Sequence, residues 1–314
     1  GEDCEYRIWQ SAVIHLKNYH RQPAPVVAGT FFTAMSELAC LADPNAVRFP
    51  YSTYSLSLNL ARRVGGWDPE WIAEDWHMGI KCFMLTLGRC RVQPVMLPTL
   101  NYTPEDCTWW STIMARWSQA KRHSLGFSDL SYYFMMLPLV FRHVKNSEGK
   151  MGPRSHELLK MIGYGFLILT KLSNVHIILG VSWFYNMVDF VLVLCMKAVF
   201  EKDRLLKELL DNMNYVPWIL AGGALVAIAL CTLHFMKLYS LVKKNVETDP
   251  GPMKIPFRWD ILHWLYLIAC LQIFGIVFFA ALTIATWRSA LLLFYQRGPL
   301  EYEVAAKPTK DNRL

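Results

Sequence analysis

Two adjacent carboxylates, Glu74 and Asp75, are the side chains of this sequence best suited to acid–base chemistry. They follow a Gly65-Gly66 turn and open a run, 76–87, in which apolar residues recur every three or four positions, so a helix is predicted. A carboxylate acts as a general base when it lies within hydrogen-bond reach of a hydroxyl, and a helix N-terminus keeps it ionised. A general base that takes the proton from a sugar hydroxyl needs both this proximity and this ionised state. The alternative interpretation is an ordinary acidic helix start.

A second group of residues that could do chemistry lies about forty positions later, at Gln119, Arg122 and His123. An arginine can bind a pyrophosphate through two parallel hydrogen bonds, and a flat ring beside it can stack on a sugar or a base. The alternative interpretation is a basic amphipathic helix that lies on lipid headgroups. The two roles do not exclude each other.

Several elements must position these residues. Val26 to Cys40 is predicted as a helix that stops at Asp43-Pro44-Asn45. The segment 91–98 is predicted as a strand that proline ends, and a helix capped by Thr103 is predicted to run to His123.

The composition indicates a membrane protein. Hydrophobic residues make up 54% of the 314 residues and charged residues 18%, which is too apolar for an ordinary soluble domain. Long apolar tracts at 157–200, 215–236 and 259–295 predict about four transmembrane spans. The domains expected are a partial catalytic domain at 1–125 that ends in an interfacial helix, an interfacial or re-entrant segment at 126–156, transmembrane helices at 157–295 and a polar tail at 296–314.

The charge pattern favours membrane lipids over nucleic acid as a partner. The net charge is +7, and Lys and Arg cluster just beyond the apolar tracts, which fits anchoring to anionic membrane lipids. The sequence has no basic face with interleaved aromatic residues, so the charge pattern does not indicate a nucleic-acid partner.

The eight cysteines form no CxxC pair and are interpreted as reduced thiols in a protein whose soluble part faces the cytosol. The chain lacks a signal peptide and an initial Met, so we expect a piece of a longer protein.

The order of these features resembles the membrane-integrated family 2 glycosyltransferases, the group that includes cellulose, chitin and hyaluronan synthases. Ala73-Glu74-Asp75 stands where that family has Thr-Glu-Asp, and the segment 119–123 stands where it has Gln-x-x-Arg-Trp. Gly65-Gly66-Trp67-Asp68 is similar to the turn that precedes the dipeptide. Phe49 to Ser55 falls at the acceptor-site turn of the family, and the segment 301–307 resembles a motif that follows its last span.

The resemblance implies an α/β fold: the C-terminal part of a GT-A type nucleotide-sugar transferase domain, followed by an interfacial helix and an all-α transmembrane bundle of about four spans. It implies an inverting transfer from a UDP- or GDP-sugar to a polysaccharide or lipid-linked acceptor. The roles implied are Asp75 as catalytic base, Glu74, Trp76, His123 and Trp117 at the acceptor, and Gln119 and Arg122 at the donor diphosphate.

The chain departs from the family pattern in two places. His123 stands in place of the tryptophan of the second motif, and the two upstream aspartate motifs that bind uridine and the metal are absent. Mg²⁺ or Mn²⁺ is therefore implied for the complete enzyme only, with ligands outside this chain, and an N-terminal half of the same protein is an implied partner.

Three hypotheses follow. The first is an integral membrane glycosyltransferase with its catalytic part facing the cytosol, and four spans favour polymer synthesis. The second is an enzyme that adds one sugar to a lipid-linked acceptor. The third is a non-catalytic membrane scaffold or transport subunit, in which Glu74-Asp75 merely starts a helix and Lys171 pairs with Asp189.

Overall fold

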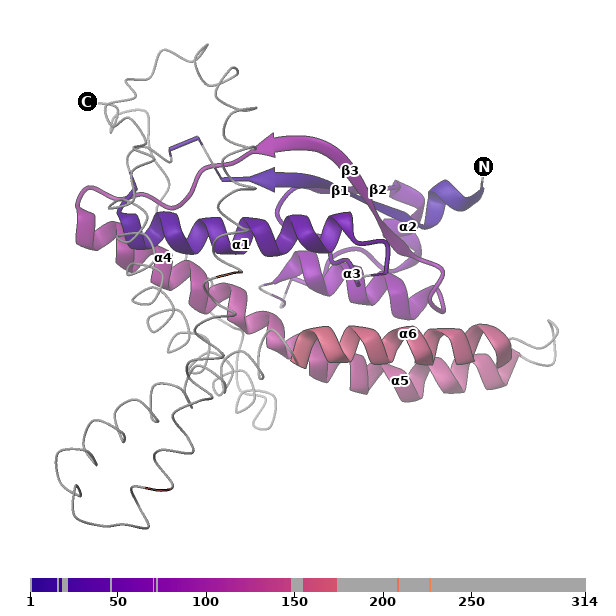
Figure 1. Ribbon diagram of the computed structural model, residues 1–314. Coiled ribbons are helices and arrows are strands. Elements are labelled where there is room, and N and C mark those ends of the chain that lie inside the picture. Colours follow the sequence, from indigo (N-terminus) through magenta and orange to yellow (C-terminus); the bar gives the residue numbers. More distant parts are fainter. Residues whose placement is uncertain are drawn as a thin grey trace.

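The computed structural model describes residues 2–15, 17–18, 22–45, 47–69, 71, 73–147 and 155–173, and the single residues 208 and 226. Its centre is a three-stranded mixed sheet in the order β2-β1-β3 (Figure 1). A short 3-10 helix, η1 (Glu2–Tyr6), leads into the middle strand β1 (Arg7–Ile14). β1 pairs antiparallel with β2 (Tyr54–Leu56) and parallel with β3 (Arg91–Leu100).

The strand β3 is longer than predicted, because it continues through Pro98 to Leu100. Proline has no amide hydrogen for a ladder, and it is therefore tolerated on edge strands and at bulges. β3 lies at an edge of the sheet, and its register against β1 shifts between Ser11 and Ala12. The prediction that Pro98 ends the strand was therefore wrong.

The first helix ends where the sequence predicts, and a second, short helix follows it. α1 (Ala24–Ala42) stops at Asp43, whose backbone is extended. α2 (Leu58–Arg63) begins at Ser57, whose hydroxyl accepts a hydrogen bond from the amide of Leu60 at 3.1 Å. Gly65 and Gly66 end this helix with φ of +81° and +75°, a conformation that glycine adopts without steric cost.

α3 (Glu74–Leu85) is the central helix and is buried on two sides. One side packs on the sheet and α2 in a cluster that we call the sheet cluster: Ile8, Leu60, Val64, Met78, Cys82 and Cys90. The other side packs in what we call the hairpin cluster: Phe49, Ile80, Phe83, Met84, Tyr133, Val140, Met161, Ile168 and Leu172. A helix apolar on two faces is typical of the middle of a fold, and here it sets the position of Glu74 and Asp75.

α4 (Trp109–Ser124) begins later than predicted, and its cap is Thr108 rather than Thr103. The Thr108 hydroxyl accepts a hydrogen bond from the Ser111 amide at 3.0 Å, and the Ser111 hydroxyl accepts one from the Thr108 amide at 2.9 Å, which forms a capping box. Thr103 is buried instead, with its amide and carbonyl bonded to the side chain of Asn18.

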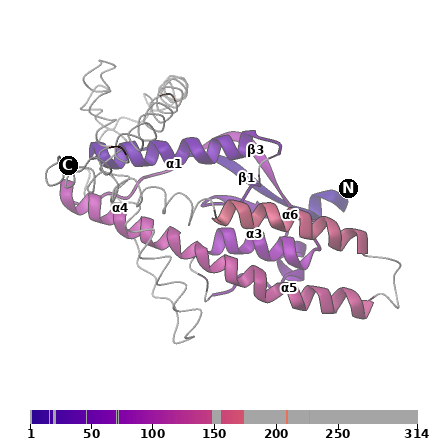
Figure 2. The same ribbon diagram turned by 60° about the horizontal axis from the view of Figure 1, so that its bottom comes forward.

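The last two described helices form an antiparallel hairpin. The short 3-10 turn η3 (Leu125–Phe127) joins α4 to α5 (Ser128–Ser147), and α6 (Ser155–Ser173) returns alongside α5 (Figures 1 and 2). α5 also packs on α3. The hairpin thus covers the face of α3 that turns away from the sheet cluster.

The fold class predicted from the sequence was wrong. We expected part of a GT-A type domain followed by an all-α transmembrane bundle of about four spans, but the described residues form a small three-stranded sheet with helices. Among them, no helix combines the length and the apolar character needed to cross a membrane. α6 explains part of the error: it supplies the start of the 157–200 tract, and Met161, Ile168 and Leu172 are buried against protein. The predicted spans beyond residue 173 lie outside the described residues.

Candidate functional site

Asp75 lies in the first turn of α3, at the positive end of the helix. Its Oδ2 accepts a hydrogen bond from the amide of Ser52 at 3.0 Å, and its Oδ1 accepts one from the amide of Trp76 at 2.8 Å. Burial raises the pKa of Asp75, and these amides and the charge of Arg122 oppose the rise without cancelling it. A fixed carboxylate with a raised pKa is a stronger base than a free aspartate.

The turn that holds Asp75 is itself held in place. Ser52 has a φ of +56°, which is uncommon for a residue with a side chain. The Asn101 side chain donates a hydrogen bond to the Ser52 hydroxyl at 3.0 Å. The buried amide of Gln10 accepts from the Tyr51 amide at 2.7 Å and donates to the carbonyls of Tyr51 and Thr53 at 3.1 and 3.3 Å. Such strain persists only where the surroundings impose it, and it concentrates at functional sites.

Glu74 faces a different set of partners. Its Oε2 accepts a hydrogen bond from the hydroxyl of Tyr54 at 2.9 Å, and that hydroxyl accepts one from Nε1 of Trp67 at 2.8 Å. The Gly-Gly turn therefore contacts the dipeptide through Trp67. The two neighbouring carboxylates have separate surroundings, which is how one site can give two carboxylates different roles.

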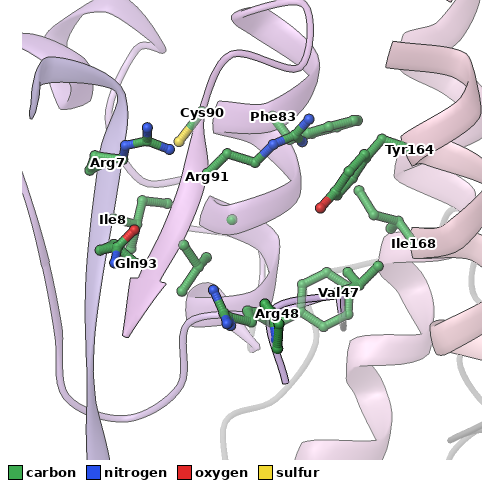
Figure 3. A pocket seen from close by; sticks show the side chains of 14 residues that line it. Arg7, Ile8, Val47, Arg48, Phe83, Cys90, Arg91, Gln93, Tyr164 and Ile168 are labelled. Atoms are coloured by element: carbon green, nitrogen blue, oxygen red, sulfur yellow. The ribbon is translucent and has the colours of Figure 1, made fainter. Parts of the chain in front are cut away.

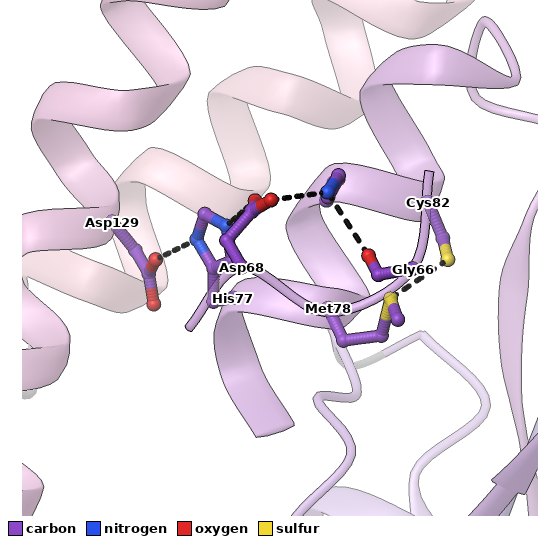
Figure 4. Close-up of polar contacts among 7 residues, drawn as sticks. Gly66, Asp68, His77, Met78, Cys82 and Asp129 are labelled. Atoms are coloured by element: carbon purple, nitrogen blue, oxygen red, sulfur yellow. Dashed lines mark hydrogen bonds and ion pairs between the residues drawn. The ribbon is translucent and has the colours of Figure 1, made fainter. Parts of the chain in front are cut away.

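A buried histidine fixes the start of α3 to two other parts of the chain (Figure 4). His77 places Nε2 at 2.7 Å from Oδ2 of Asp68 in the Gly-Gly turn, and Nδ1 at 2.8 Å from Oδ1 of Asp129 in α5. Lys81 completes the network by donating to Oδ1 of Asp68 at 2.7 Å and to the Gly66 carbonyl at 3.0 Å. The ring of His77 also stacks on Trp71, with centroids 4.4 Å apart.

The two aspartates of this bridge differ in proton affinity. Burial raises the pKa of Asp129 to about 6, against the opposing effect of His77. Burial would also raise the pKa of Asp68, but the hydrogen bonds from Lys81 and His77 outweigh it and leave that pKa below its ordinary value. Both pKa values lie below 7, so both carboxylates are ionised at neutral pH, and Asp129 takes up a proton first as the pH falls.

The structure brings part of the second motif to the dipeptide. The charge of Arg122, near the end of α4, acts on Asp75. The turn that follows α4 touches the start of α3, because a Cβ placed on Gly126 would lie 3.4 Å from Cβ of Ala73. Gln119 accepts a hydrogen bond from Arg116, one turn earlier on the same helix.

The three ring side chains expected at the acceptor lie in different surroundings. Trp76 is half-buried, and its ring packs on Phe49 with centroids 4.7 Å apart at the edge of the hairpin cluster. Trp117 is half-buried in α4, and His123 near the end of α4 is exposed.

A third carboxylate reaches this region from α1. Burial raises the pKa of Glu37 to about 8, the charge of Arg116 opposes this rise, and the charge of Asp75 adds to it. Arg116 is buried, and burial lowers its pKa to about 10. Oε2 of Glu37 is buried without a hydrogen-bond partner in the part of the chain that the structure describes.

The sequence analysis missed Glu37, Gln10, His77 and Asp129 as parts of this region. A signal existed for Glu37, because it is a lone carboxylate in an otherwise apolar helix, and such groups are rarely buried without a reason. His77 could have been suspected from its place two residues after Asp75. Nothing local marks Asp129, which meets His77 only through the packing of α5 on α3.

The described residues were also tested as ligands for the implied Mg²⁺ or Mn²⁺. No group of three or more His, Cys, Asp or Glu side chains within them could hold a metal ion. The residues described therefore do not fit the implied metal, and no step below passes through it.

Comparison with known proteins adds no relative. No protein-family model matches the chain, and searches of curated proteins and of solved structures found no match.

Proposed function

We propose that the chain belongs to an inverting glycosyltransferase that moves a sugar from a nucleotide-sugar donor to a hydroxyl of a polysaccharide or glycolipid acceptor. The observation that supports this most is the setting of Asp75. Its carboxylate is anchored by the Ser52 amide at 3.0 Å, its pKa is raised by burial, and the charge of Arg122 acts on it.

In this proposal Asp75 is the general base. It takes the proton from the acceptor hydroxyl while the oxygen attacks the anomeric carbon, on the side opposite the leaving nucleoside diphosphate. The bond from the anomeric carbon to the phosphate oxygen breaks, and the electron pair leaves with the diphosphate. Configuration inverts because there is a single displacement.

The negative charge that develops on the diphosphate needs a cation near the base. In this proposal Arg122, near the end of α4, would supply that cation, because a guanidinium binds phosphate oxygens through two hydrogen bonds. Gln119, one turn earlier, would bind the same group through its amide. Glu74 would bind an acceptor hydroxyl together with Tyr54, whose hydroxyl it already meets at 2.9 Å.

The test compares Asp75→Asn with the wild type in the full-length protein, using radiolabelled UDP- and GDP-sugars with added Mg²⁺ or Mn²⁺. Asparagine keeps an oxygen that can accept from Ser52 but cannot take the proton. Incorporation of sugar should fall by about 10²–10⁴-fold, the usual contribution of a general base. Asp43→Asn is the matched control, because it removes the same charge from an exposed loop residue.

Two outcomes would contradict the proposal. Equal incorporation by Asp75→Asn and wild type would remove Asp75 from the chemistry. No incorporation from any donor by folded wild type would favour the non-catalytic scaffold or transport subunit. If the wild type does incorporate sugar, the length of the product distinguishes polymer synthesis from the addition of one sugar.

A further inference from the structure

A cavity of about 240 Å³ lies between β1, β3, α3 and α6, and the loop before Phe49 closes one side (Figure 3). Its walls are partly apolar, with Ile8, Val47, Phe83 and Ile168 among them. Phe49 and Gly79 belong both to this cavity and to the surroundings of α3 near Asp75, but Asp75, Glu74 and Arg122 do not line it. The function proposed above therefore neither uses nor explains this cavity.

Three arginines line the cavity, and none of the described residues around it carries a carboxylate. Arg7 opens β1 and Arg91 opens β3, and the two residues stand opposite each other in the parallel register. Arg48 comes from the loop on the other side (Figure 3). Within the part of the chain that the structure describes, no ion pair joins any of the three to an acidic side chain.

Like charges placed directly across two neighbouring strands destabilise a sheet. Apolar walls strengthen the repulsion, because the local dielectric constant is lower than that of water. Burial lowers the pKa of Arg91, Tyr164 and Cys90 oppose this shift, and the neighbouring charge of Arg7 adds a smaller lowering. A folded chain that keeps three such charges together without an anion is under electrostatic strain, and a bound anion would relieve it.

The guanidinium groups are also oriented. Arg91 lies over the ring of Tyr164, with its central carbon 3.6 Å from the ring centroid. Arg48 donates from Nη2 to the carbonyl of Asp43 at 2.9 Å, while its Nε is buried and has no acceptor within the described residues. A buried donor without a partner costs free energy, so an anion that accepts from Nε of Arg48 would recover that cost.

We propose that this cavity, which we call the arginine pocket, binds a phosphate or diphosphate group. The planar guanidinium matches the oxygens of phosphate, and it is the side chain most used for such groups. The volume is below the roughly 300–1,000 Å³ of sites that take a whole drug-sized molecule, so the pocket suits the anionic group rather than a complete nucleotide.

Two sources could supply this group, a soluble phosphate compound or the phosphate headgroup of a lipid. Both present the same oxygens to the same arginines. The experiment therefore has two arms. One titrates inorganic pyrophosphate into the purified full-length protein by calorimetry, and the other measures binding to vesicles of phosphatidic acid and phosphatidylcholine against vesicles of phosphatidylcholine alone.

The pocket variant is the double substitution Arg7→Gln, Arg48→Gln, which leaves Arg91 on the ring of Tyr164. Its control carries Arg62→Gln, which removes a positive charge from an exposed residue outside the pocket. All proteins carry Arg122→Gln, so that the diphosphate site of the proposed transferase does not contribute. The pocket variant should bind at least about tenfold more weakly than the control, because each lost guanidinium removes charge-assisted hydrogen bonds.

A second variant protects the test against misfolding. Gln93 lies two residues after Arg91 on β3 and lines the same pocket, so Gln93→Glu places a carboxylate among the guanidinium groups. This variant should melt at a higher temperature than the wild type without anion, and it should lose the binding. Gain of stability with loss of binding cannot result from unfolding.

The two arms decide between the sources. Binding of pyrophosphate that requires Arg7 and Arg48 supports a soluble ligand, and binding to phosphatidic acid vesicles that requires them supports a lipid. The proposal is overturned when neither probe binds, or when the pocket variant and the Arg62→Gln control bind equally. Because Arg122 is absent throughout, failure of the arginine pocket and failure of the transferase proposal give separate results.

Discussion

Glu37 shows at the scale of one residue how surroundings change a carboxyl group. Burial raises its pKa from the ordinary value of 4.5 to about 8 in the folded chain, even though the charge of Arg116 opposes the rise. At neutral pH the side chain therefore keeps its proton and is a neutral acid, although the charge of Asp75 still acts on it. A neutral neighbour leaves Asp75 free to ionise, whereas a second anion would raise its pKa further.

Stability should depend on pH through Glu37. Between pH 4.5 and about 8 the folded chain holds one proton that the unfolded chain has lost, so the free energy of unfolding falls as pH rises. One proton corresponds to about 1.4 kcal/mol per pH unit. The Glu37→Gln variant lacks this titrating proton. The difference between its free energy of unfolding and that of the wild type, variant minus wild type, should therefore increase with pH across that range. Urea denaturation at pH 5, 6, 7 and 8 measures the difference.

The other groups that titrate in this range, Asp129 among them, are present in both proteins and cancel in the difference. A difference that stays constant from pH 5 to pH 8 would mean that Glu37 has an ordinary pKa in the folded chain. Its proposed neutral state would then be wrong.

At the scale of elements, the position of Asp75 depends on how closely a loop approaches α3. Gly79 makes this approach possible, because a Cβ at that position would lie 2.6 Å from Cδ of Pro50, two residues before Ser52. Contacts that short do not occur in folded proteins, so the loop would have to move. The Ser52 amide would then move away from Asp75.

Gly79→Ala should therefore destabilise the fold although alanine favours helices. Crowding in a packed interior costs about 1–3 kcal/mol, more than the gain of up to about 1 kcal/mol from helix propensity. Gly163→Ala is the matched control, because it lies in α6 with no atom within 4 Å of the added Cβ, and it should raise the free energy of unfolding. Urea denaturation checks both; equal stability of the two variants would show that Pro50 does not constrain Gly79.

At the scale of the whole molecule, α3 joins the sheet to the helical hairpin. It contributes to both apolar clusters, and His77 adds a polar link from Asp68 in the Gly-Gly turn to Asp129 in α5. Both His77 and Asp129 are almost without exposure, at 1% and 0%. Removing one partner leaves the other buried and unpaired, whereas an apolar pair can replace both.

A double-mutant cycle tests this link. His77→Phe, which keeps an aromatic ring beside Trp71, should lower the free energy of unfolding by about 3–5 kcal/mol because Asp129 stays buried without a partner. Adding Asp129→Leu should recover most of that loss. Urea denaturation gives the coupling energy. If the double variant is as unstable as the sum of the two single variants, the contact at 2.8 Å contributes nothing to stability.

Local features of the chain could be predicted from the sequence because a few neighbouring residues decide them. Gly65 and Gly66 form the predicted turn, Asp43 ends α1 as predicted, and Glu74 and Asp75 stand at the start of the predicted helix α3. Each depends on backbone conformation or on a capping position within one turn. The cap of α4 was misplaced because Thr103 and Thr108 carry the same local signal, and only the contact of Thr103 with Asn18 separates them.

Only the tertiary structure decided which distant groups meet and what each apolar face contacts. The charge of Arg116 acts on Glu37, His77 contacts Asp129, and Arg7 stands opposite Arg91, because the packing of helices and the register of strands join residues that are far apart in the chain. The apolar residues of α6 have the same spacing whether they face lipid or protein. The burial of Met161, Ile168 and Leu172 against α3 and α5 is a property of the folded chain, while other apolar residues of α6 stay exposed, and no pattern in the sequence distinguishes the two cases.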